Sequence, residues 1–235
     1  MQRHFKKLLI GKGRTEDVPR RSVIERRWEN ITAIWNNEFD EDSGLEKVVR
    51  LALAASQFLF PGMYIRQLFW RRGPQSQDLA TEVFVLLKTT FPAVALHQGW
   101  EHQPIVLFLV VWFMLETVIY IPTLIFASDT FSSPRSYRRS QILILLNYVE
   151  VVFTFGVIYA SGNYLNKAFT HWADPIYFSF VTNSTIGFGE YFPVTPMGKA
   201  IVCLQSLFYL SYIVLFINFF TVGRQRGYFS GRGTE

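Results

Sequence analysis

The sequence predicts an all-α membrane protein, and three observations lead to this fold class. Half of the 235 residues are hydrophobic, and the 17% aromatic share includes 23 phenylalanines. Several apolar runs reach the roughly 20 residues that an α-helix needs to cross a hydrocarbon core of about 30 Å. Charged residues are concentrated in the first 50 positions. We therefore expect a polar, basic N-terminal region followed by membrane-spanning helices.

The N-terminal region, residues 1–44, is expected to be cytoplasmic and to contain an amphipathic helix. Four apolar residues share one helical face by their i, i+4, i+7, i+11 spacing: Ile24, Trp28, Ile31 and Trp35. The opposite face is polar: Arg26, Arg27, Glu29 and Asn30. We expect the apolar face to pack beneath the membrane spans or along a neighbouring subunit. The alternative is a lipid-sensing or inhibitory arm that presents arginines to anionic headgroups: Arg20, Arg21, Arg26 and Arg27.

Residues 45–78 are predicted to form an interfacial amphipathic helix and a linker. The polar residues of the apolar region from Leu45 to Trp70 fall near helical spacing, which is typical of a helix lying in the membrane surface. A true span is the alternative, and Phe60-Pro61-Gly62 is expected to bend or break the helix. The preceding stretch EFDEDSGLE, residues 38–46, lacks the spacing of a Ca²⁺ loop, so we expect a solvated linker.

Residues 79–127 are predicted to form a two-helix transmembrane hairpin. Its spans are Leu79–Leu96, a weaker candidate that Glu82 and Lys88 interrupt, and Ile105–Phe126, in which Glu116 is the only formal charge. Ionisable residues inside a membrane are functional candidates and are expected to have partners. Lys88 and Glu116 lie on adjacent antiparallel spans at depths that differ by about one turn. We therefore expect an intramembrane ion pair between them.

Residues 141–222 contain two further spans with a loop between them. The spans are Gln141–Ala160 and Ile201–Val222. Asp174-Pro175 is a helix-start signal, with Asp174 as the N-cap and Pro175 at the first helical position. The helix that follows is about ten residues long, too short to cross the membrane, and leads into TIGFG at 185–189. Non-helical backbone at membrane depth is tolerated only where protein or water satisfies it, so we expect a re-entrant loop that lines a wet path.

The distribution of Lys and Arg predicts the orientation. Residues 1–27 hold nine Lys or Arg, and basic patches recur at 71–72, 134–139 and 224–232. The segments between them, 97–103, 161–173 and 190–199, contain only Lys167 and Lys199. The positive-inside rule therefore places both termini in the cytoplasm and the re-entrant loop outside. This requires an even number of spans, which four candidates satisfy.

The sequence gives little support to enzymes, metal sites and nucleic-acid binding. We find no paired nucleophile and base, no two-carboxylate motif within the spans and no basic groove interleaved with aromatic residues. His97, Glu101 and His102 could bind a transition metal, although ordinary loop polarity is the simpler interpretation. Cys203 lies inside an apolar run and is expected to have a packing role. We expect no enzyme activity and no metal beyond a permeant ion.

The order of span, short helix, Thr-x-Gly-aromatic-Gly and span resembles the potassium-channel pore family. The resemblance implies a pore domain over 141–222, an expected four-fold homotetramer, and K⁺ as the permeant ion. It also implies that the ion-binding filter is Thr185, Ile186, Gly187, Phe188 and Gly189, supported by Thr182, Ser184 and Glu190. Phe188 is expected to point away from the axis and to brace the loop. Phe188 and Glu190 stand where the family more commonly has Tyr and Asp, and Asn183-Ser184 also departs from its pattern.

The expected function is a tetrameric potassium-selective channel with a short cytoplasmic tail, residues 223–235. No span carries arginines at every third position, so we expect no conventional voltage sensor. The alternatives are a weakly selective cation channel on the same scaffold and a non-conducting regulatory pore-loop subunit. His171 is a candidate pH sensor near the outer mouth. The expected partners are further copies of the chain and anionic membrane lipids, and the expected location is a bacterial plasma membrane.

Overall fold

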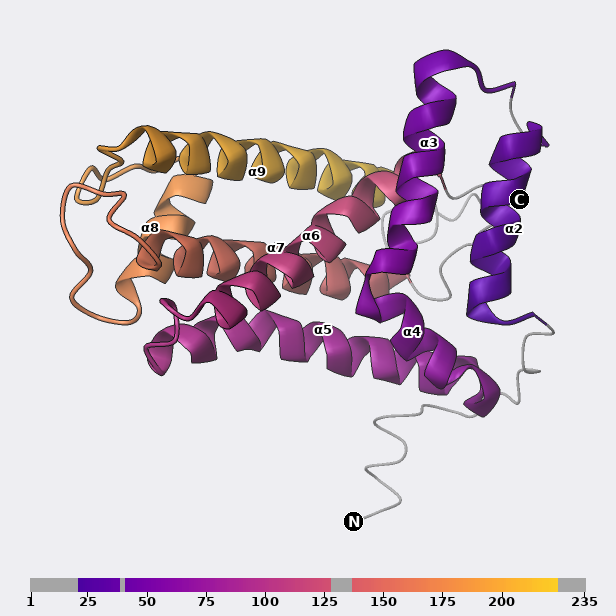
Figure 1. Ribbon diagram of the computed structural model, residues 1–235, viewed down its shortest axis with the longest axis horizontal. Helices are drawn as coiled ribbons and strands as arrows, with labels where there is room; N and C mark the ends of the chain where they lie inside the picture. The colour runs from indigo at the N-terminus through magenta and orange to yellow at the C-terminus, as the bar shows by residue number, and fades with distance from the viewer. Residues whose placement is uncertain (1–20, 39–40, 128–136, 224–235) are drawn as a thin grey trace, which may run out of the picture. The chain divides into compact units, whose positions relative to one another are not determined.

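The computed structural model describes residues 21–38, 41–127 and 137–223. Within these ranges the regular secondary structure is helical, apart from one isolated antiparallel bridge between Leu165 and Pro193. The predictions for Arg20, for the basic patch up to residue 136 and for the tail from residue 224 fall outside the described residues. In chain order the helices are α2 (Val23–Asn36), α3 (Gly44–Ser56), η1 (Gln57–Leu59), α4 (Pro61–Leu68), η2 (Trp70–Arg72), α5 (Pro74–His97), α6 (Pro104–Phe126), α7 (Tyr137–Ala160), α8 (Asp174–Asn183) and α9 (Pro196–Gly223) (Figure 1).

Membrane-crossing length and composition are met by three of the helices among the described residues. They are Pro74–His97, Arg138–Ala160 and Pro196–Val214. A fourth span arises if α3 with η1 and α4 count as one broken helix. The stretch Pro104–Tyr120 of α6 is also apolar but shorter than these spans. The all-α membrane fold class is therefore confirmed.

The chain forms two compact units, each of which is described by itself. The first comprises Met1–Leu86 and Val118–Ser132, and the second comprises Leu87–Thr117 and Ser133–Glu235. The first unit therefore contains α2, α3, α4 and the adjoining ends of α5 and α6. The second contains α7, α8, α9 and the remaining parts of α5 and α6.

Helix α2 begins with a capping box and buries a different face from the one predicted. The Ser22 hydroxyl accepts from the Glu25 N–H at 3.2 Å, and the Glu25 carboxylate accepts from the Ser22 N–H at 2.8 Å. Trp28 and Trp35 are 64% and 66% exposed. The buried face contains Asn30, whose amide donates to the Ala127 carbonyl oxygen at 2.9 Å. Within this unit the two tryptophans of the predicted apolar face are therefore uncovered, and the packing of that face along a neighbouring subunit stays a prediction.

The described residues of the acidic stretch before α3 are exposed, as the prediction of a solvated linker expects, except for Asp42. Asp42 is 5% exposed, and its carboxylate accepts a hydrogen bond from the buried Arg50 guanidinium of α3. Because a buried charge is tolerated when it is paired, Arg50 can lie inside the unit. Helical spacing alone does not indicate this contact between Arg50 and Asp42.

The break that the sequence predicts at Phe60-Pro61-Gly62 is confirmed. α4 begins at Pro61, and the axis bends by 62° between α3 with η1 and α4. Pro61 stands in the first turn, where its missing N–H costs no helical hydrogen bond. The bend is compatible with an interfacial helix and with a broken span, so both alternatives stay open.

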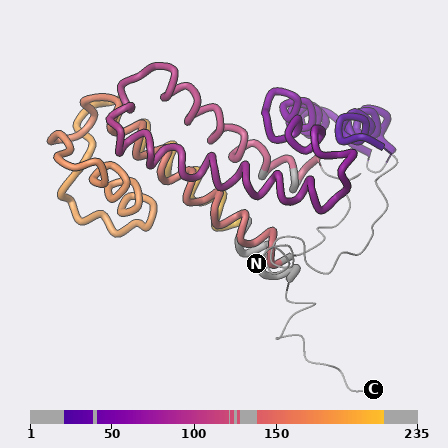
Figure 2. Tube along the Cα trace, turned by 90° about the horizontal axis from the view of Figure 1, so that it is seen from below, coloured from indigo at the N-terminus to yellow at the C-terminus, as the bar shows by residue number. Residues whose placement is uncertain are grey.

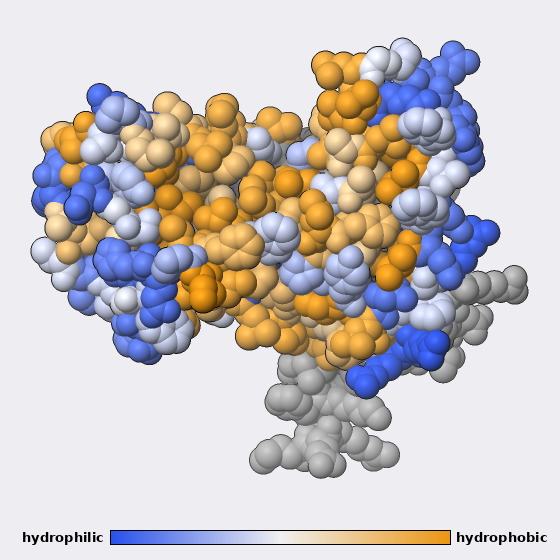
Figure 3. Space-filling view, in the orientation of Figure 1, coloured by the Kyte–Doolittle hydropathy of each residue, from blue (hydrophilic) through white to orange (hydrophobic). Residues whose placement is uncertain are grey.

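The second unit packs α8 against α7 and α9 at one end of these two long helices (Figure 1). A core of Leu96, Val110 and Val157 joins α5, α6 and α7, and Ile176 of α8 packs against it. Figure 2 shows the parts of α5 and α6 in this unit running in opposite directions after a tight turn. Figure 3 shows apolar residues over the long helices and hydrophilic residues over the loops around α8. α8 is therefore held by apolar packing with loops on its outer side.

We expect the change of Asn30 to Leu to destabilise the first unit. The substitution leaves the buried Ala127 carbonyl without the amide donor of Asn30, which costs about 1–3 kcal/mol. Thermal unfolding of the purified protein in detergent measures the effect. The matched control is Thr32→Val on the exposed side of the same helix, whose transition should stay close to that of the wild type. An Asn30→Leu protein as stable as this control would show that the hydrogen bond is unimportant.

Candidate functional site

The candidate site is built around the C-terminal end of α8 and the segment 185–189 that follows it. α8 buries Pro175, Phe178, Ser179 and Asn183. Two carbonyl groups near the end of α8 bind the residues that follow the helix. The Thr182 oxygen accepts from the Thr185 N–H and the Val181 oxygen accepts from the Ile186 N–H, both at 3.2 Å. The N–H groups at the start of the segment are thereby satisfied by the helix. Below, residues 185–189 are called the filter segment.

The filter segment has an alternating backbone. φ is +59° at Thr185, +56° at Gly187 and +79° at Gly189, whereas Ile186 and Phe188 are not among the residues with positive φ. Alternation between right-handed and left-handed φ turns successive carbonyl groups toward the same side of the chain. No protein donor bonds to the carbonyls of residues 185–189 within the described part of the chain. The segment therefore carries a row of carbonyl oxygens that can coordinate a cation.

The two glycines of the filter segment are required by backbone conformation and not by lack of space. A Cβ added at Gly187 or at Gly189 would meet no atom within 4 Å. The positive φ of both residues is the conformation that side chains disfavour and that glycine adopts freely. Thr185 adopts it with a side chain, which is uncommon outside glycine, Asn and Asp and costs of order 1–3 kcal/mol. Strain of this kind is typical of functional sites.

The side chains of the filter segment are directed outward in the single chain. Phe188 is 68% exposed, so the brace that the sequence predicts for it is not made within one chain. Together with Thr182 and Thr185, Phe188 lines a hollow of about 310 Å³. Val202 and Ser206 of α9 line its other side. The described residues of this chain therefore leave most of the Phe188 ring uncovered, and its bracing role stays a prediction.

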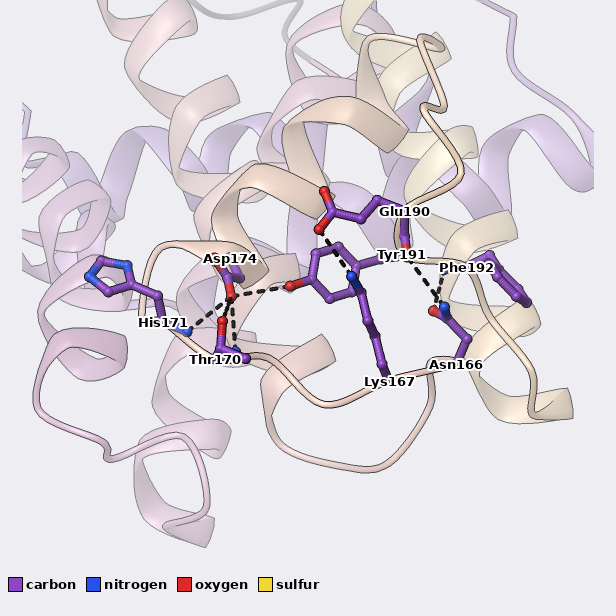
Figure 4. Close-up of polar contacts among 8 residues, drawn as sticks. All are labelled: Asn166, Lys167, Thr170, His171, Asp174, Glu190, Tyr191 and Phe192. Atoms are coloured by element: carbon purple, nitrogen blue, oxygen red, sulfur yellow. Dashed lines mark hydrogen bonds and ion pairs between the residues drawn. The ribbon is translucent and has the colours of Figure 1, made fainter.

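The outer end of the filter segment is attached to the loop that precedes α8 (Figure 4). The Lys167 ammonium lies 3.0 Å from the Glu190 carboxylate and 4.5 Å from the centre of the Tyr191 ring. The Asn166 amide donates to the Glu190 carbonyl at 3.2 Å, and its oxygen accepts from the Phe192 N–H at 2.9 Å. We call these contacts of Asn166 and Lys167 the outer anchor. They give Glu190 a supporting position beside the filter segment.

Asp174 forms a second anchor at the start of α8. The structure makes it the first residue of the helix, with Ala173 as the N-cap, so the prediction of Asp174 as N-cap is wrong by one position. Its Oδ2 accepts from the N–H groups of Thr170 and His171, both at 2.9 Å. The same oxygen accepts from the hydroxyls of Thr170 at 3.0 Å and Tyr191 at 3.1 Å. One carboxylate thus joins the outer loop, α8 and the residue that follows Glu190.

These hydrogen bonds keep Asp174 charged. Burial acts to raise the pKa of Asp174, but the donors of His171, Thr170 and Tyr191 outweigh it and lower this pKa below its ordinary value. Burial and the hydrogen bond to the carboxylate both raise the pKa of Tyr191. A charged Asp174 and a protonated Tyr191 therefore stabilise each other.

A third anchor is a buried hydrogen-bonded network that we call the polar clamp. The Tyr159 hydroxyl of α7 donates to the Gln205 Oε1 of α9 at 2.7 Å. Gln205 Nε2 donates to the Ser179 carbonyl at 3.0 Å and lies 2.9 Å from its hydroxyl, which donates to the Val152 carbonyl at 2.7 Å. All three clamp side chains are almost inaccessible to solvent. The clamp fixes the middle of α8 between the two long helices.

An intramembrane ion pair joins α5 to α7. The Lys88 ammonium lies 3.1 Å from the Glu150 carboxylate, and both side chains are buried. Thr117 of α6 contacts Lys88 and donates its hydroxyl to Glu150 at 2.7 Å. Glu116 lies close enough for its charge to interact with Glu150. The predicted Lys88–Glu116 pair stays a prediction, and the structure shows Lys88 paired with Glu150.

The remaining predicted residues, His171 and Ser184, lie before the start and at the end of α8. The exposed His171 accepts a hydrogen bond at Nδ1 from the Ala173 N–H at 3.2 Å, and its ring lies 5.5 Å from that of Trp172. The Ser184 hydroxyl donates to the Val181 carbonyl at 3.2 Å. Among the described residues no cluster of three or more His, Cys, Asp or Glu could hold a metal ion. The roles of His171 and Ser184 stay predictions.

Comparison with known proteins agrees with this geometry. Residues 147–222 match the family model described as "Ion channel". A protein named "Potassium channel K1" from Plasmodium berghei (strain Anka) is 30% identical over 96 residues, which cover 38% of this chain and 5% of the relative. The chain thus matches a small part of that relative's length, and no solved structure matches it. The family match covers the segment that contains α8 and the filter segment, and the two matches together support the potassium-channel pore family.

We expect the change of Tyr159 to Phe to loosen the polar clamp. It leaves the buried Gln205 Oε1 without its donor, so the unfolding free energy should fall by about 1–3 kcal/mol. The melting temperature in detergent measures this loss. Ser206→Ala provides the matched control, since this exposed hydroxyl beside Gln205 bonds only back to the Val202 carbonyl of its own helix. Equal melting temperatures for the two variants would contradict a stabilising clamp.

The Asp174 anchor predicts a specific dependence of stability on pH. A carboxyl with a depressed folded-state pKa contributes stability above its unfolded pKa of about 3.9, and this contribution is lost as the pH falls through the folded-state value. Wild type should therefore exceed Asp174→Asn in stability at pH 7, and the difference should shrink below about pH 4. Unfolding curves of both proteins from pH 7 to pH 3 test this. A difference that is constant over the range would exclude the charged carboxylate as its source.

Proposed function

We propose that this chain, whose residues 147–222 match the ion-channel family, assembles as a homotetramer that conducts K⁺ passively through the filter segment. Four copies of Thr185–Gly189 would surround one axis, with their carbonyl oxygens replacing the hydration shell of the ion. The ion would be the only bound group required. The matched relative is named a potassium channel, which favours K⁺ over other cations.

The observation that carries this proposal is the alternating backbone of the filter segment. Left-handed φ recurs at Thr185, Gly187 and Gly189, directly after a short helix that lies between two helices of membrane-crossing length. Carbonyl groups that lack protein donors need water or a cation when they lie within a membrane. A cation pathway accounts for the position, the conformation and the glycines together.

Electrostatics at the end of α8 supports the same function. The C-terminal end of a helix carries the negative end of its macrodipole, equivalent to roughly half an elementary charge. The filter segment starts at this end, where the Val181 and Thr182 carbonyls lie. α8 would thus favour a cation, and disfavour an anion, beside the filter segment.

One filter segment per chain and the exposed apolar surface both support assembly from several chains, which we propose to be four. One chain supplies one filter segment among the described residues, so several copies are needed to enclose an ion. Ile186 and Phe188 are exposed in the single chain, and so are several apolar residues of α9: Met197, Leu204, Leu207, Leu210 and Val214. Neighbouring copies and lipid would cover this surface. A partner chain would also supply the contacts that Phe188 lacks.

Two finer properties are part of the proposal. We infer that gating does not use a conventional voltage sensor, and that the channel lies in a plasma membrane, bacterial by expectation, with both termini in the cytoplasm. Phe188 and Glu190 are the residues at which conduction would depart from the commonest behaviour of the family. A weakly selective cation channel and a non-conducting subunit are the alternatives that measurement has to separate.

The decisive measurement is ion flux into liposomes that contain only this protein. We expect barium-sensitive K⁺ flux, and a reversal potential in mixed Na⁺ and K⁺ close to that of K⁺. Equal permeability would identify the weakly selective channel. Absence of flux from correctly folded protein would identify the non-conducting subunit.

The glycine requirement gives a matched pair of variants. Gly187→Ala should abolish the flux because alanine disfavours the φ of +56° at this position. Gly99→Ala places the same kind of strain, at a φ of +70° with equally open space, in the turn between α5 and α6. The Gly99 variant should retain the flux. If both variants conduct alike, the filter segment is not the conduction path.

A further inference from the structure

Three arginines of the first unit come together where α2 meets α4. The first turn of α2 is attached to α4 because the Gln67 Oε1 accepts from the N–H groups of Val23 at 2.9 Å and Ile24 at 3.3 Å. Arg66 precedes Gln67 on α4, and Arg26 and Arg27 follow within one turn of α2. Arg66 lies close enough to interact electrostatically with both of them. The fold therefore holds like charges together at this junction.

This arrangement is unfavourable without an anion. Burial and the neighbouring charge of Arg66 lower the pKa of Arg26, and burial foremost lowers the pKa of Arg27 to about 10, which leaves Arg27 charged at neutral pH. Glu29 is the acidic group that faces Arg26, but its carboxylate already binds the exposed Arg21 at 2.7 Å. The junction thus keeps a surplus of positive charge.

Hydrogen-bond donors at the junction are also left over. The Nε atoms of Arg26 and Arg66 are buried and find no acceptor among the described residues. A buried N–H without an acceptor is costly, and an arginine fork matches the geometry of a phosphate group. These donors are therefore suited to bind an anion with several acceptor oxygens.

The surroundings indicate which anion this is. Trp28 and Trp35 of α2 are largely exposed, as are Leu59 and Leu68 beside the bend that leads into and out of α4. Tryptophan beside aliphatic residues is typical of a surface that lies at the level of lipid headgroups. A phosphate at this level belongs to a phospholipid. The assignment to a lipid depends on the exposure of Trp28 and Trp35, since buried indole rings could not contact headgroups.

We propose that Arg26, Arg27 and Arg66 form a binding site for the phosphate group of an anionic phospholipid headgroup. The guanidinium groups bind the phosphate, and the exposed indole rings lie among the headgroups and upper acyl chains. The site lies outside residues 147–222, so it is independent of the match to the ion-channel family. Its test does not require conduction.

Ligand-dependent thermal stability of the full chain in detergent tests the proposal. A ligand that binds only the folded state raises the melting temperature with its concentration. Short-chain phosphatidylglycerol should raise the melting temperature of the wild type, whereas short-chain phosphatidylcholine should not. The double change Arg26→Gln and Arg66→Gln should weaken phosphatidylglycerol binding roughly 30-fold. Equal shifts by both lipids in the wild type would overturn the proposal whatever the variants do.

Control proteins and ligands separate a site from general charge attraction. Arg71→Gln with Arg72→Gln removes the same charge from exposed arginines a few residues further on, and should leave phosphatidylglycerol binding unchanged. An equal loss in this control would refute a specific site. Arg26→Lys with Arg66→Lys keeps the charge but removes the fork, so binding should be intermediate; wild-type affinity would refute the bidentate contact. If glycerol phosphate alone stabilises the protein as strongly as the lipid, the ligand is a soluble anion and the lipid assignment fails.

Discussion

The need to satisfy backbone polar groups within a membrane governs the second unit. The helix α8 accepts the N–H groups at the start of the filter segment, which leaves the carbonyl groups without protein donors. Left-handed φ at alternate positions then turns these oxygens to one side. The arrangement would collapse in hydrocarbon without a cation or water to bind the oxygens. The other contacts of this unit can be understood as holding that strained backbone in place.

Three anchors do this with different strength. The polar clamp is dry, so each of its hydrogen bonds is expensive to leave unmade. Asp174 concentrates four donors on one carboxylate oxygen. The Lys167–Glu190 pair of the outer anchor faces water, where an ion pair contributes about 0–1 kcal/mol. Helix α8 is therefore fixed firmly, whereas the end of the filter segment at Glu190 is fixed weakly.

The sequence patterns predicted where the helices lie better than they predicted which residues those helices contact. Apolar length located α5, α7 and α9, and Pro61 located the break before α4. Helical periodicity finds the apolar face of α2 with Trp28, but it does not indicate that Asn30 on the polar face is buried within this unit. Charge partners such as Glu150 for Lys88, or Lys167 for Glu190, depend on helix rotation and on loop paths between distant segments. The glycine motif was found because positive φ restricts the residue type, whereas Asn166 acts through ordinary hydrogen bonds that leave no local signal.

The exposure of the Lys167–Glu190 pair opens this end of the filter segment to the surrounding solution. Dissolved salt screens such a pair over a Debye length of about 10 Å at 0.1 M and about 3 Å at 1 M. In a potassium channel the screening salt includes the transported ion. Under the proposed function, a rise in K⁺ on that side of the membrane would fill the conduction path and weaken the neighbouring attachment at the same time. The rigidity of the outer mouth would vary with the concentration gradient that drives the current.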